Sequence, residues 1–436
     1  MSEVYSMSQL DRRDFLKRAA AMTTGLMGAG LLQPRQAAAE PPVSPVAVRA
    51  CKHYDRALIK QTLGRMFGDL GGLSGLVSGR KVGIKLNLTS LNGNVQTQHG
   101  VQFKYSDTTH PDVAYALAQL MIEAGAERVK FLESSYSATL SVEPLFASMG
   151  YNVPEFRALG NGSQVDFHDT RAAGEFFTGP HATPNGGSFN DYWEADPLTG
   201  AGAGPSYLFN KFYMNKWYSP AECDVFVSLA KQKGHDTCGV TLSSKNLFGC
   251  WPLSVYGSNA TASIITDDRA GGSGPEEART FGRSVSGHNG GWDPLGPVGA
   301  KLASEHGVST YEGNRMPRLI VDLIRARPIH IAVIDGIMGS QPAWGPTNNS
   351  SVTTPGILVA GFNPICADAV CVGIMGQDPQ AADGTGMFLS CKNYLNLAAD
   401  KQIGSNDLSR IPIVGDPIWK VRYDYYPHVK KSGVIA

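Results

Sequence analysis

An alternation of strand and helix patterns constrains the fold of this chain more than any other feature of its sequence. Residues 81–88 read KVGIKLNL and residues 128–134 read RVKFLES, and both runs are typical of buried strands. Between them, residues 111–125 place apolar side chains at helical spacing, with proline in the first turn and glycine at the end. The three segments predict a βαβ unit with two parallel strands and a right-handed crossover.

The alternation continues through the second half of the chain. Strand or helix patterns occur at residues 224–231, 315–326, 330–335, 356–360 and 364–376. They predict an α/β fold with an open, largely parallel sheet, helices on both faces and long loop-rich insertions. The insertions, residues 160–206 and 251–314, show no periodicity. Loops of this length in a compact chain usually form lids or subunit contacts.

The N-terminal 39 residues have the parts of an export signal. Arg12 and Arg13 precede Phe-Leu-Lys, an uncharged, weakly apolar run covers residues 19–32, and Ala37-Ala38-Ala39 follows. This arrangement resembles a twin-arginine signal peptide, which implies recognition by the twin-arginine export machinery, removal of the signal and a periplasmic or extracellular location. The apolar run is shorter than the roughly 20 residues that span a bilayer, so we expect no stable membrane insertion after cleavage.

The predicted organisation therefore has three parts. Residues 1–39 are the signal peptide, residues 40–80 an extended arm with a helix at about 54–68, and residues 81–436 the α/β domain. That domain is either one unit or two lobes, at about 81–206 and 207–436. Lys and Arg balance Asp and Glu at 38 each, which gives no sign of a nucleic-acid groove. Small-molecule chemistry is the better expectation.

The cysteine pattern and the missing motifs exclude several kinds of site. Seven cysteines are scattered without a C-x-x-C pair, so we expect no intrinsic iron–sulfur cluster. Several, such as Cys366 and Cys371, lie in apolar runs where a buried free thiol is the ordinary state, and export to an oxidising compartment would also allow one or two disulfides. The chain also lacks G-x-G-x-x-G after its first strand, a Walker loop, H-E-x-x-H and G-x-S-x-G, which disfavours nucleotide binding, zinc proteolysis and a standard serine hydrolase.

Polar side chains follow the predicted strands at the points where they end. Lys85 and Asn87 end the first strand and Glu133 the second, Lys231, Lys233 and His235 follow a third, and Asp335 ends a fourth. Parallel strands present their carboxyl ends at one edge, where open α/β sheets bind ligands. We therefore expect Lys85, Lys233, His235, Lys245 and Asp335 to surround one crevice at this edge.

Each candidate also has a structural interpretation. Lys85 could simply pair with Glu133 in the neighbouring strand, because an unpaired lysine inside an apolar strand is costly. His235 could be a loop histidine, and His110 could cap the helix that follows it. Asp368 lies about one turn inside a predicted helix, where packing and a dipole interaction are equally good explanations.

The same segments resemble the domain-of-unknown-function family number 362. The phrases VGIKLNLTS, CDVFVSLAKQKGH, TLSSKNLFG, IHIAVIDG and NPICADAV follow its motif order between residues 82 and 376. The resemblance implies recurrent polar positions at Lys85, Asn87, Lys233, His235, Lys245, Asn246, Asp335 and Asp368. Leu86, Gly234 and Asn363 depart from the family pattern, and the Cys-rich ferredoxin-like module of many members is missing. The family's activity is itself unassigned.

These residues suit a small anionic or hydroxylated ligand, a divalent metal, or both. We assign catalytic roles to His235, Lys85, Lys233 and Asp335, and ligand-binding roles to Asn87, Glu133, Lys245, Asn246 and Asp368. The leading hypothesis is an exported enzyme that acts on such a metabolite by acid/base or metal-assisted chemistry. The alternatives are a non-catalytic protein that binds a metal, a cofactor or a partner for assembly, and a redox accessory that docks to an iron–sulfur partner.

Overall fold

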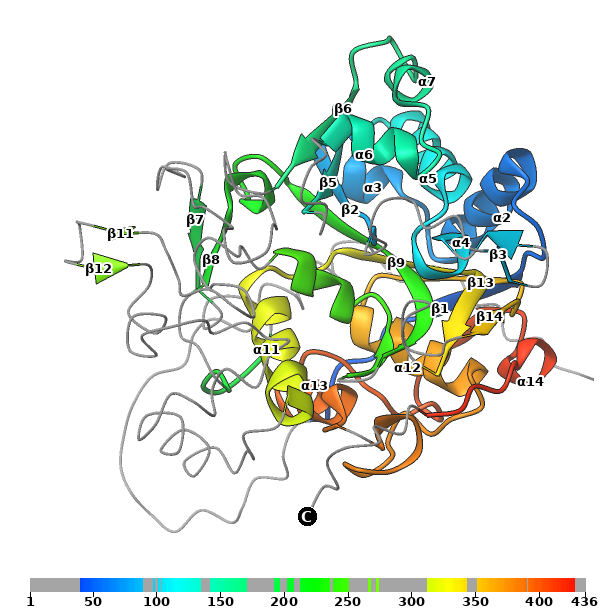
Figure 1. Cartoon of the computed structure of the whole chain (residues 1–436), viewed down its shortest axis with the longest axis vertical. Helices are drawn as coiled ribbons and strands as arrows, with labels where there is room; N and C mark the ends of the chain where they lie inside the picture. The colour runs from blue at the N-terminus through cyan, green and yellow to red at the C-terminus, as the bar shows by residue number, and fades with distance from the viewer. Residues whose placement is uncertain are drawn as a thin grey trace, which may run out of the picture. The chain divides into compact units, whose positions relative to one another are not determined.

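A ten-stranded sheet organises the computed structural model (Figure 1), whose main path has the strand order β16-β1-β15-β13-β9-β2-β5-β6. The structure describes residues 40–88, 97–98, 101–102, 104–134, 142–170, 192–196, 202–207, 212–235, 238–250, 266–267, 272–273, 312–342, 351–389 and 391–427. They all lie in the unit that begins at Glu40. The predicted signal, residues 1–39, lies outside the described residues, as does most of the insertion at 251–314.

Five neighbouring strands form the parallel part of the sheet. They are β13 (Ile331–Gln341), β9 (Val225–His235), β2 (Lys81–Lys85), β5 (Arg128–Glu133) and β6 (Val165–Asp169). Each of the first four coincides with a strand that the sequence predicted. β6 was not predicted, because it lies inside the insertion at 160–206 and is only five residues long. Since β2 joins β5 on one side and β9 on the other, strands from both halves of the chain share one sheet.

The sheet departs from parallel order on the other side of β13. β15 (Ile357–Gly361) runs antiparallel to β13 and to β1 (Val46–Ala50), and β1 runs parallel to β16 (Ile413–Gly415). The residues expected to form an extended arm thus contribute a strand to the sheet. Two short strands, β10 (Gly239–Thr241) and β14 (Ser351–Thr353), add antiparallel pairings to β9 and β13. The prediction of an open, largely parallel α/β sheet is confirmed.

Helices cover both faces of this sheet, as predicted. α2 (Arg56–Asp69) and α5 (Pro111–Glu123) pack with Val227 of β9 in one apolar core. α11 (Glu312–Ala326), α12 (Pro364–Ile374) and α13 (Tyr394–Asp400) pack with Phe226 in the other. The alternation of β9 residues between the two cores follows from the period of two in a strand.

The N-termini of the long helices are capped by side chains. Asp55, His110 and Asn363 accept backbone N–H groups in the first turns of α2, α5 and α12, respectively. Asn363 accepts from both Ile365 and Cys366, at 3.0 Å each. Such caps satisfy N–H groups that have no partner inside the helix. The capping role considered for His110 in the sequence is therefore observed.

The remaining described elements are short. They comprise α3 (Ser74–Val77), β3 (Thr97–Gln98), β4 (Val101–Gln102), α4 (Lys104–Asp107), α6 (Val142–Ser148), α7 (Val153–Arg157), β7 (Tyr192–Ala195), β8 (Phe212–Asn215), η3 (Lys216–Tyr218), η4 (Lys245–Cys250), β11 (Thr266–Asp267), β12 (Gly272–Ser273), η8 (Gly386–Phe388) and α14 (Ile418–Val421). None of the helices in the described ranges combines the length and apolar character needed to cross a bilayer. The seven cysteines are all described, buried and without disulfides.

A bulge in β13 shifts its register against β9. Asp335 pairs with Lys231, and the next in-register pair is Ser340 with Lys233. From one pair to the next, β13 advances by five residues and β9 by two, so β13 contains three extra residues. Gly339 allows the bulge to close, because a Cβ atom there would lie 2.2 Å from the backbone oxygen of Gln232. Bulges of this kind re-aim side chains and are common next to functional sites. Here the bulge brings Ser340 beside Lys233.

Candidate functional site

A group of buried charged residues lies at the carboxyl ends of β9 and β13, on the face covered by α2 and α5. We call Tyr54, Asp107, Lys231, Lys233 and Asp335 the lysine cluster. Lys231 and Asp335 are register partners and are completely buried, and their Nζ and Oδ2 atoms are 2.9 Å apart. Lys231 also donates to the Tyr54 hydroxyl at 2.6 Å, and that hydroxyl donates to Asp335 Oδ1 at 3.1 Å. The three side chains form a closed hydrogen-bonded ring.

The burial of this ring perturbs its proton affinities. Burial lowers the pKa of Lys231, and the adjacent Asp335 carboxylate opposes that shift. Burial raises the pKa of Tyr54 well above its usual value, and Asp335 adds to the increase. The carboxylate of Asp335 also accepts backbone N–H groups from His110 and Ile337, both at 3.2 Å. Asp335 is thus held by donors on every side and orients the lysine and the tyrosine.

His110 lies against the ring, and its imidazole contacts Tyr54. Its imidazole stacks on the Tyr54 ring with centroids 3.7 Å apart and planes 9° apart. Its Nδ1 accepts the Asp112 N–H that begins α5. The stacking fixes the Tyr54 ring, and therefore the position of its hydroxyl between Lys231 and Asp335.

Lys233 forms a second buried ion pair two residues along β9. Its Nζ lies 2.9 Å from Asp107 Oδ1 and donates to the Asp107 carbonyl oxygen at 2.7 Å. Both side chains are about 1% exposed. Burial lowers the pKa of Lys233 and Asp107 opposes the shift, with weaker contributions from Glu133, which raises it, and Lys85, which lowers it. The charges of Glu133 on β5 and Lys85 on β2, as well as that of Asp107, therefore affect the pKa of Lys233.

Hydroxyl groups without partners flank Lys233 on both neighbouring strands. Thr241 of β10 and Ser340 of β13 are the register partners of Lys233, so the three side chains leave the sheet on the same face. The Oγ1 atom of Thr241 and the Oγ atom of Ser340 are buried and make no hydrogen bond. A buried polar group left unpaired costs about 1–3 kcal/mol. A ligand or bound water that accepted or donated hydrogen bonds beside the Lys233 ammonium group would satisfy both hydroxyls.

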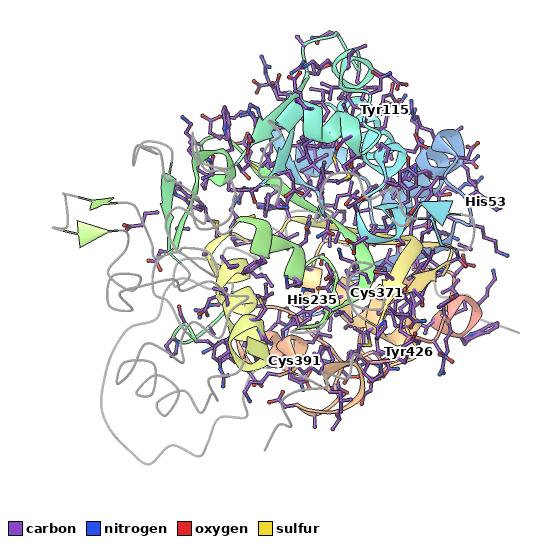
Figure 2. The ribbon with its side chains drawn as sticks, in the orientation of Figure 1. His53, Tyr115, His235, Cys371, Cys391 and Tyr426 are labelled. Carbon is purple, nitrogen blue, oxygen red and sulfur yellow. The ribbon has the colours of Figure 1, made fainter. Side chains whose placement is uncertain are left out.

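His235 ends β9 four residues beyond Lys231. It is 4% exposed and pairs in register with Gly239 of β10. Figure 2 labels it near the end of the green β9 strand. Because side chains alternate along a strand, His235 leaves β9 on the same face as Lys231 and Lys233. The period-two pattern of the sequence therefore continues through the whole length of β9.

Lys85 belongs to a different group, which we call the asparagine cluster: Lys85, Asn87, Glu133 and Asn246. The Lys85 Nζ atom lies 2.6 Å from Glu133 Oε1, and both side chains are 2–3% exposed. Glu133 Oε2 accepts the N–H of Leu88 at 2.9 Å. The ion pair considered as the structural interpretation of Lys85 is thus present.

The two asparagines connect this pair to η4. Asn87 Nδ2 donates to Asn246 Oδ1 at 3.0 Å, and Asn246 Nδ2 donates to the Lys85 carbonyl oxygen at 3.3 Å and to Ser228 Oγ at 3.1 Å. The Oδ1 atom of Asn87 is buried without a hydrogen-bond partner. The asparagine cluster therefore joins β2, β9 and η4 and keeps one unused acceptor.

The sequence grouped Lys85 and Asp335 around one crevice, and the structure places them on opposite faces of the sheet. Lys85 pairs in register with Ser228, whereas Asp335 pairs with Lys231. Ser228 and Lys231 are three residues apart, so their register partners leave opposite faces of the sheet. Lys233, His235 and Asp335 are brought to one face, and Lys85, Asn87 and Asn246 belong to the other. Thr109 and His110 connect the two groups: Thr109 Oγ1 accepts the Asn87 N–H at 3.0 Å, and the His110 N–H donates to Asp335 at 3.2 Å.

Asp368 anchors the loop that leads from β10 to the asparagine cluster residue Asn246. In α12, its Oδ1 accepts the N–H and the hydroxyl of Ser243 at 2.9 and 2.6 Å, and its Oδ2 accepts the Ser244 N–H and the Tyr394 hydroxyl, both at 3.0 Å. Burial raises its pKa, and these donors oppose the increase. Asp368 therefore fixes the turn from β10 into η4.

Lys245 lies at the start of η4, directly after this anchored turn. Its Nζ atom is 4.6 Å from the centroid of the Phe248 ring, and the residue is 6% exposed. The contact has cation–π geometry. Lys245 thus depends on the position of the turn that Asp368 holds.

Several residues of this site were not selected from the sequence. Tyr54 precedes α2 and Asp107 ends α4, and neither falls in a predicted strand. Thr241 and Ser340 belong to strand ends that only the pairing with β9 defines. Lys231 was noted at a strand end but given no role, although its period-two spacing from Lys233 was the available signal.

A resident metal was one candidate in the sequence. Among the side chains that the structure describes, no three His, Cys, Asp or Glu residues are arranged to hold a metal ion. The acids of both clusters instead face lysine ammonium groups. This donor set is better suited to an anion that competes for those ammonium groups.

Comparison with known proteins identifies a family model that matches part of the chain, without assigning an activity. The model of the family described as "Domain of unknown function (DUF362)" matches residues 203–373. This segment contains Lys233, His235, Lys245, Asn246, Asp335 and Asp368, whereas Lys85, Asn87 and Glu133 precede it. No curated protein matches the chain.

One solved structure, of a protein from Thermotoga maritima, is similar at 13% identity with a TM-score of 0.31. The similarity covers 66% of this chain and 51% of that one, so this chain spans about half the length of that protein. The resemblance that the motifs predicted is confirmed over residues 203–373, which match the DUF362 family.

Proposed function

We propose that this protein binds a small anionic or hydroxylated ligand at the carboxyl ends of β9 and β13 and acts on it by acid/base chemistry. One observation carries the proposal. Two fully buried lysines, Lys231 and Lys233, lie two residues apart on one face, and unpartnered hydroxyls of Thr241 and Ser340 flank the second. Open α/β sheets bind their ligands at this edge.

The energetic cost of the arrangement supports a functional role. Removing a charge from water costs several kcal/mol per ion, and replacement of a buried ion pair by apolar residues is often neutral or stabilising. The lysine cluster buries two such pairs, Lys231 with Asp335 and Lys233 with Asp107. A fold that needed only stability would gain little from them. Strongly perturbed ionisable groups that gather at one edge are typical of binding and catalytic sites.

The roles of the residues follow from their positions. Lys233 supplies the positive charge, and the two hydroxyls beside it supply hydrogen bonds to ligand oxygen atoms. His235, on the same face, is the proton donor or acceptor. Lys231, Tyr54 and Asp335 form a hydrogen-bonded relay behind Lys233, which can take up or return a proton without exposing a charge to solvent.

A non-catalytic ligand-binding protein is the second candidate. It is favoured by the contacts of Lys231, whose ammonium group already binds both Tyr54 and Asp335 within the protein. Such a protein would bind the same anions but would leave them unchanged. Incubation of the bound probe with the protein, followed by mass spectrometry of the probe, separates the two candidates.

Removal of the flanking hydroxyls tests the binding site. The probes are phosphate, sulfate, malate and glucose, each titrated by calorimetry. We expect at least one anionic probe to bind, and Thr241→Val or Ser340→Ala to weaken its affinity about tenfold, the equivalent of one lost hydrogen bond. Both variants should fold as stably as the wild type or more so, because the hydroxyls have no protein partner to lose.

Thr385→Val is the matched control, since its hydroxyl binds the Ala382 carbonyl oxygen at an exposed site. It should leave probe affinity unchanged. Two results would refute the proposed site: none of the four probes binds the wild type, or both hydroxyl variants bind every probe with wild-type affinity. An effect on glucose alone would retain the site but change the ligand class from anionic to hydroxylated.

We also propose that the twin-arginine machinery exports the chain to the periplasm or the extracellular space. Arg12 and Arg13 before the apolar run motivate the proposal. Changing both to lysine is expected to leave the precursor in the cytoplasm, because the pair is the recognition element of this route. Fractionation with immunoblotting measures the distribution. Equal export of the variant, or an exported protein that still begins at Met1, would contradict the assignment.

A further inference from the structure

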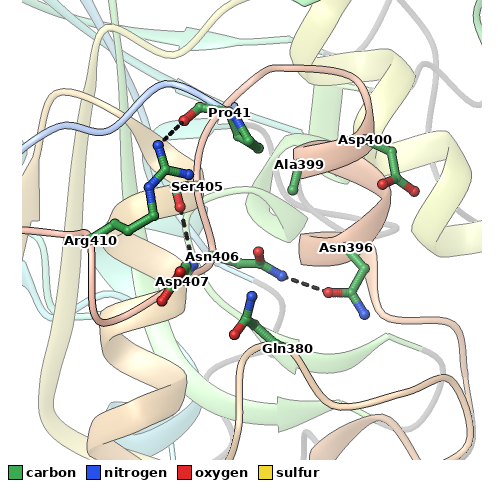
Figure 3. Close-up of a pocket in the computed structure, with 9 residues that line it drawn as sticks. All are labelled: Pro41, Gln380, Asn396, Ala399, Asp400, Ser405, Asn406, Asp407 and Arg410. Carbon is green, nitrogen blue, oxygen red and sulfur yellow. Dashed lines mark hydrogen bonds between the residues drawn. The ribbon is translucent and has the colours of Figure 1, made fainter. Parts of the chain in front are cut away.

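A polar pocket of about 300 Å³ lies beside α13, far along the chain from the lysine cluster (Figure 3). Its lining is almost entirely hydrogen-bonding side chains: Gln380, Asn396, Asp400, Ser405, Asn406, Asp407 and Arg410, with Pro41 and Ala399. The volume is at the lower end of the range for small-ligand sites. The lack of aromatic or large aliphatic lining indicates a small, charged or strongly polar occupant.

The beginning of the predicted mature chain is fastened at this pocket. Glu40 Oε2 lies 2.9 Å from Arg410 Nη2, and the same nitrogen donates to the Pro41 carbonyl oxygen at 3.2 Å. The Ser405 N–H donates to the Pro42 carbonyl oxygen at 2.8 Å. Figure 3 shows the Arg410 side chain directed at Pro41. Since consecutive Cα atoms are about 3.8 Å apart, the backbone nitrogen of Glu40 lies within one residue of the pocket lining.

The pocket carries net negative charge once its ion pair is counted. Glu40 neutralises Arg410, which leaves the carboxylates of Asp400 and Asp407. Neither acid takes part in an ion pair within the described residues. Lys401 follows Asp400 but donates to the Pro205 carbonyl oxygen. Hydrogen bonds from Ser409 lower the pKa of Asp407, so this carboxylate stays ionised.

The side-chain amides of Asn406 and Asn396 donate to acceptors within the protein. Asn406 Nδ2 donates to Asn396 Oδ1 at 2.6 Å and to the Pro379 carbonyl oxygen at 3.2 Å. Asn396 Nδ2 donates to the Ala381 carbonyl oxygen at 3.0 Å. The pocket therefore offers carboxylate and amide oxygen atoms as acceptors, and a group with several N–H donors and a positive charge fits it best.

We propose that this pocket binds a primary ammonium group and that its occupant is the α-ammonium group of Glu40, released when the signal is cleaved after Ala39. The inference rests on the proposed export. Before cleavage the same nitrogen is an uncharged amide with a single hydrogen, so the pocket gains its ligand only in the mature chain. Cleavage then adds a contact to the segment that leads into β1, whose strand lies between β15 and β16.

The titration of the Glu40 amine tests this proposal. A fusion removed by a protease yields the chain that starts at Glu40, whatever the native cleavage site. The rate of α-amine acetylation by acetic anhydride is measured from about pH 6 to 10, with mass spectrometry of the N-terminal peptide. We expect a midpoint about half a unit to one unit above the ordinary 7.7–8.0. Asp400→Asn with Asp407→Asn should return it to the ordinary value.

Glu143→Gln, which removes an exposed acid elsewhere on the chain, should leave the midpoint unchanged.

A raised pKa of the Glu40 amine also predicts how the stability of the fold changes with pH. An amine with a raised folded-state pKa contributes stability below its unfolded pKa, and this contribution is lost as the pH rises through the folded-state value. The midpoint of urea unfolding of the wild type should thus fall relative to the double asparagine variant between about pH 8 and 9.

An ordinary midpoint in the wild type, or an elevated one that survives in the double variant, would overturn the pocket proposal. N-terminal sequencing of the exported protein tests the cleavage site separately. A native start other than Glu40 would refute cleavage after Ala39, and with it the native occupant, even if the engineered amine titrates as expected.

Discussion

Replacing Asp335 by alanine is expected to lower the free energy of unfolding by about 3–5 kcal/mol. The reason is the charge that remains: Lys231 is completely buried, and Asp335 provides its only counterion, at 2.9 Å, among the described residues. The substitution also removes the acceptor for the Tyr54 hydroxyl and for two backbone N–H groups. Urea unfolding followed by circular dichroism at neutral pH measures the loss.

Two further variants make this prediction specific. Asp166→Ala breaks an ion pair with Arg128 whose partners are 37% and 45% exposed, and should cost less than about 1 kcal/mol. Lys231→Met combined with Asp335→Leu removes both charges together and should recover most of the lost stability. A single Asp335→Ala variant as stable as the wild type would mean that Lys231 is neutral or finds another partner, and the ion-pair description would then be wrong.

The variant that combines Lys231→Met with Asp335→Leu also distinguishes a functional role of this ion pair from a purely structural one. If the relay of Lys231, Tyr54 and Asp335 serves the bound ligand, the double apolar variant should fold well yet fail to turn over a probe that the wild type converts. If the pair only maintains the structure, folding and function should recover together. The lysine cluster is thus a case in which stability and function can be measured apart.

The sheet and its covering helices could be predicted because their signals are local. The run at 111–125 and the run at 364–376 have helical spacing and begin with a proline, and both became helices within two residues of the predicted ends. Buried strands such as β9 and β13 read as apolar runs, so their existence was clear. Both strands continue several residues past their predicted ends. The sequence did not predict this extension, because charged residues such as Lys231, Lys233 and Asp335 are uncommon inside a buried strand.

The division of the site between two faces could not be predicted, because it depends on register. The sequence placed Lys85 and Asp335 at strand ends; Lys85 does end β2, whereas Asp335 lies inside β13, which continues to Gln341. Which face a side chain takes changes with a shift of one residue, and nothing local fixes Lys85 opposite Ser228. Strand-end position therefore predicts the edge of a sheet but not the face.

The acids that pair with the two β9 lysines illustrate a second limit. Asp335 was selected because it ends a strand, whereas Asp107 belongs to the four-residue helix α4 and Tyr54 precedes α2. Their contacts with β9 span 126 and 177 residues of sequence, respectively. Such long-range pairs arise only when the sheet is assembled, and the sequence carries no periodic signal for them.

Replacing Asp368 by alanine is expected to destabilise the fold by about 3 kcal/mol or more, because it removes the acceptor for four hydrogen bonds inside the core. Two of the donors are backbone N–H groups of Ser243 and Ser244, which would be left buried and unpaired. They form the turn that sets Lys245 in place, so the variant should also lose affinity for any anion that the carboxyl edge binds. Urea unfolding and probe calorimetry measure the two effects.

Tyr394→Phe is the graded control, since it removes only the bond at 3.0 Å to Asp368 Oδ2 and leaves the turn attached. It should cost about 1 kcal/mol and leave probe affinity unchanged. The sequence assigned Asp368 to ligand binding, and this comparison decides between that role and a positioning role. An Asp368→Asn variant that unfolds like the wild type but no longer binds the probe would support direct ligand contact. Parallel losses of stability and affinity, with Tyr394→Phe intermediate in stability alone, would make Asp368 the anchor of the turn.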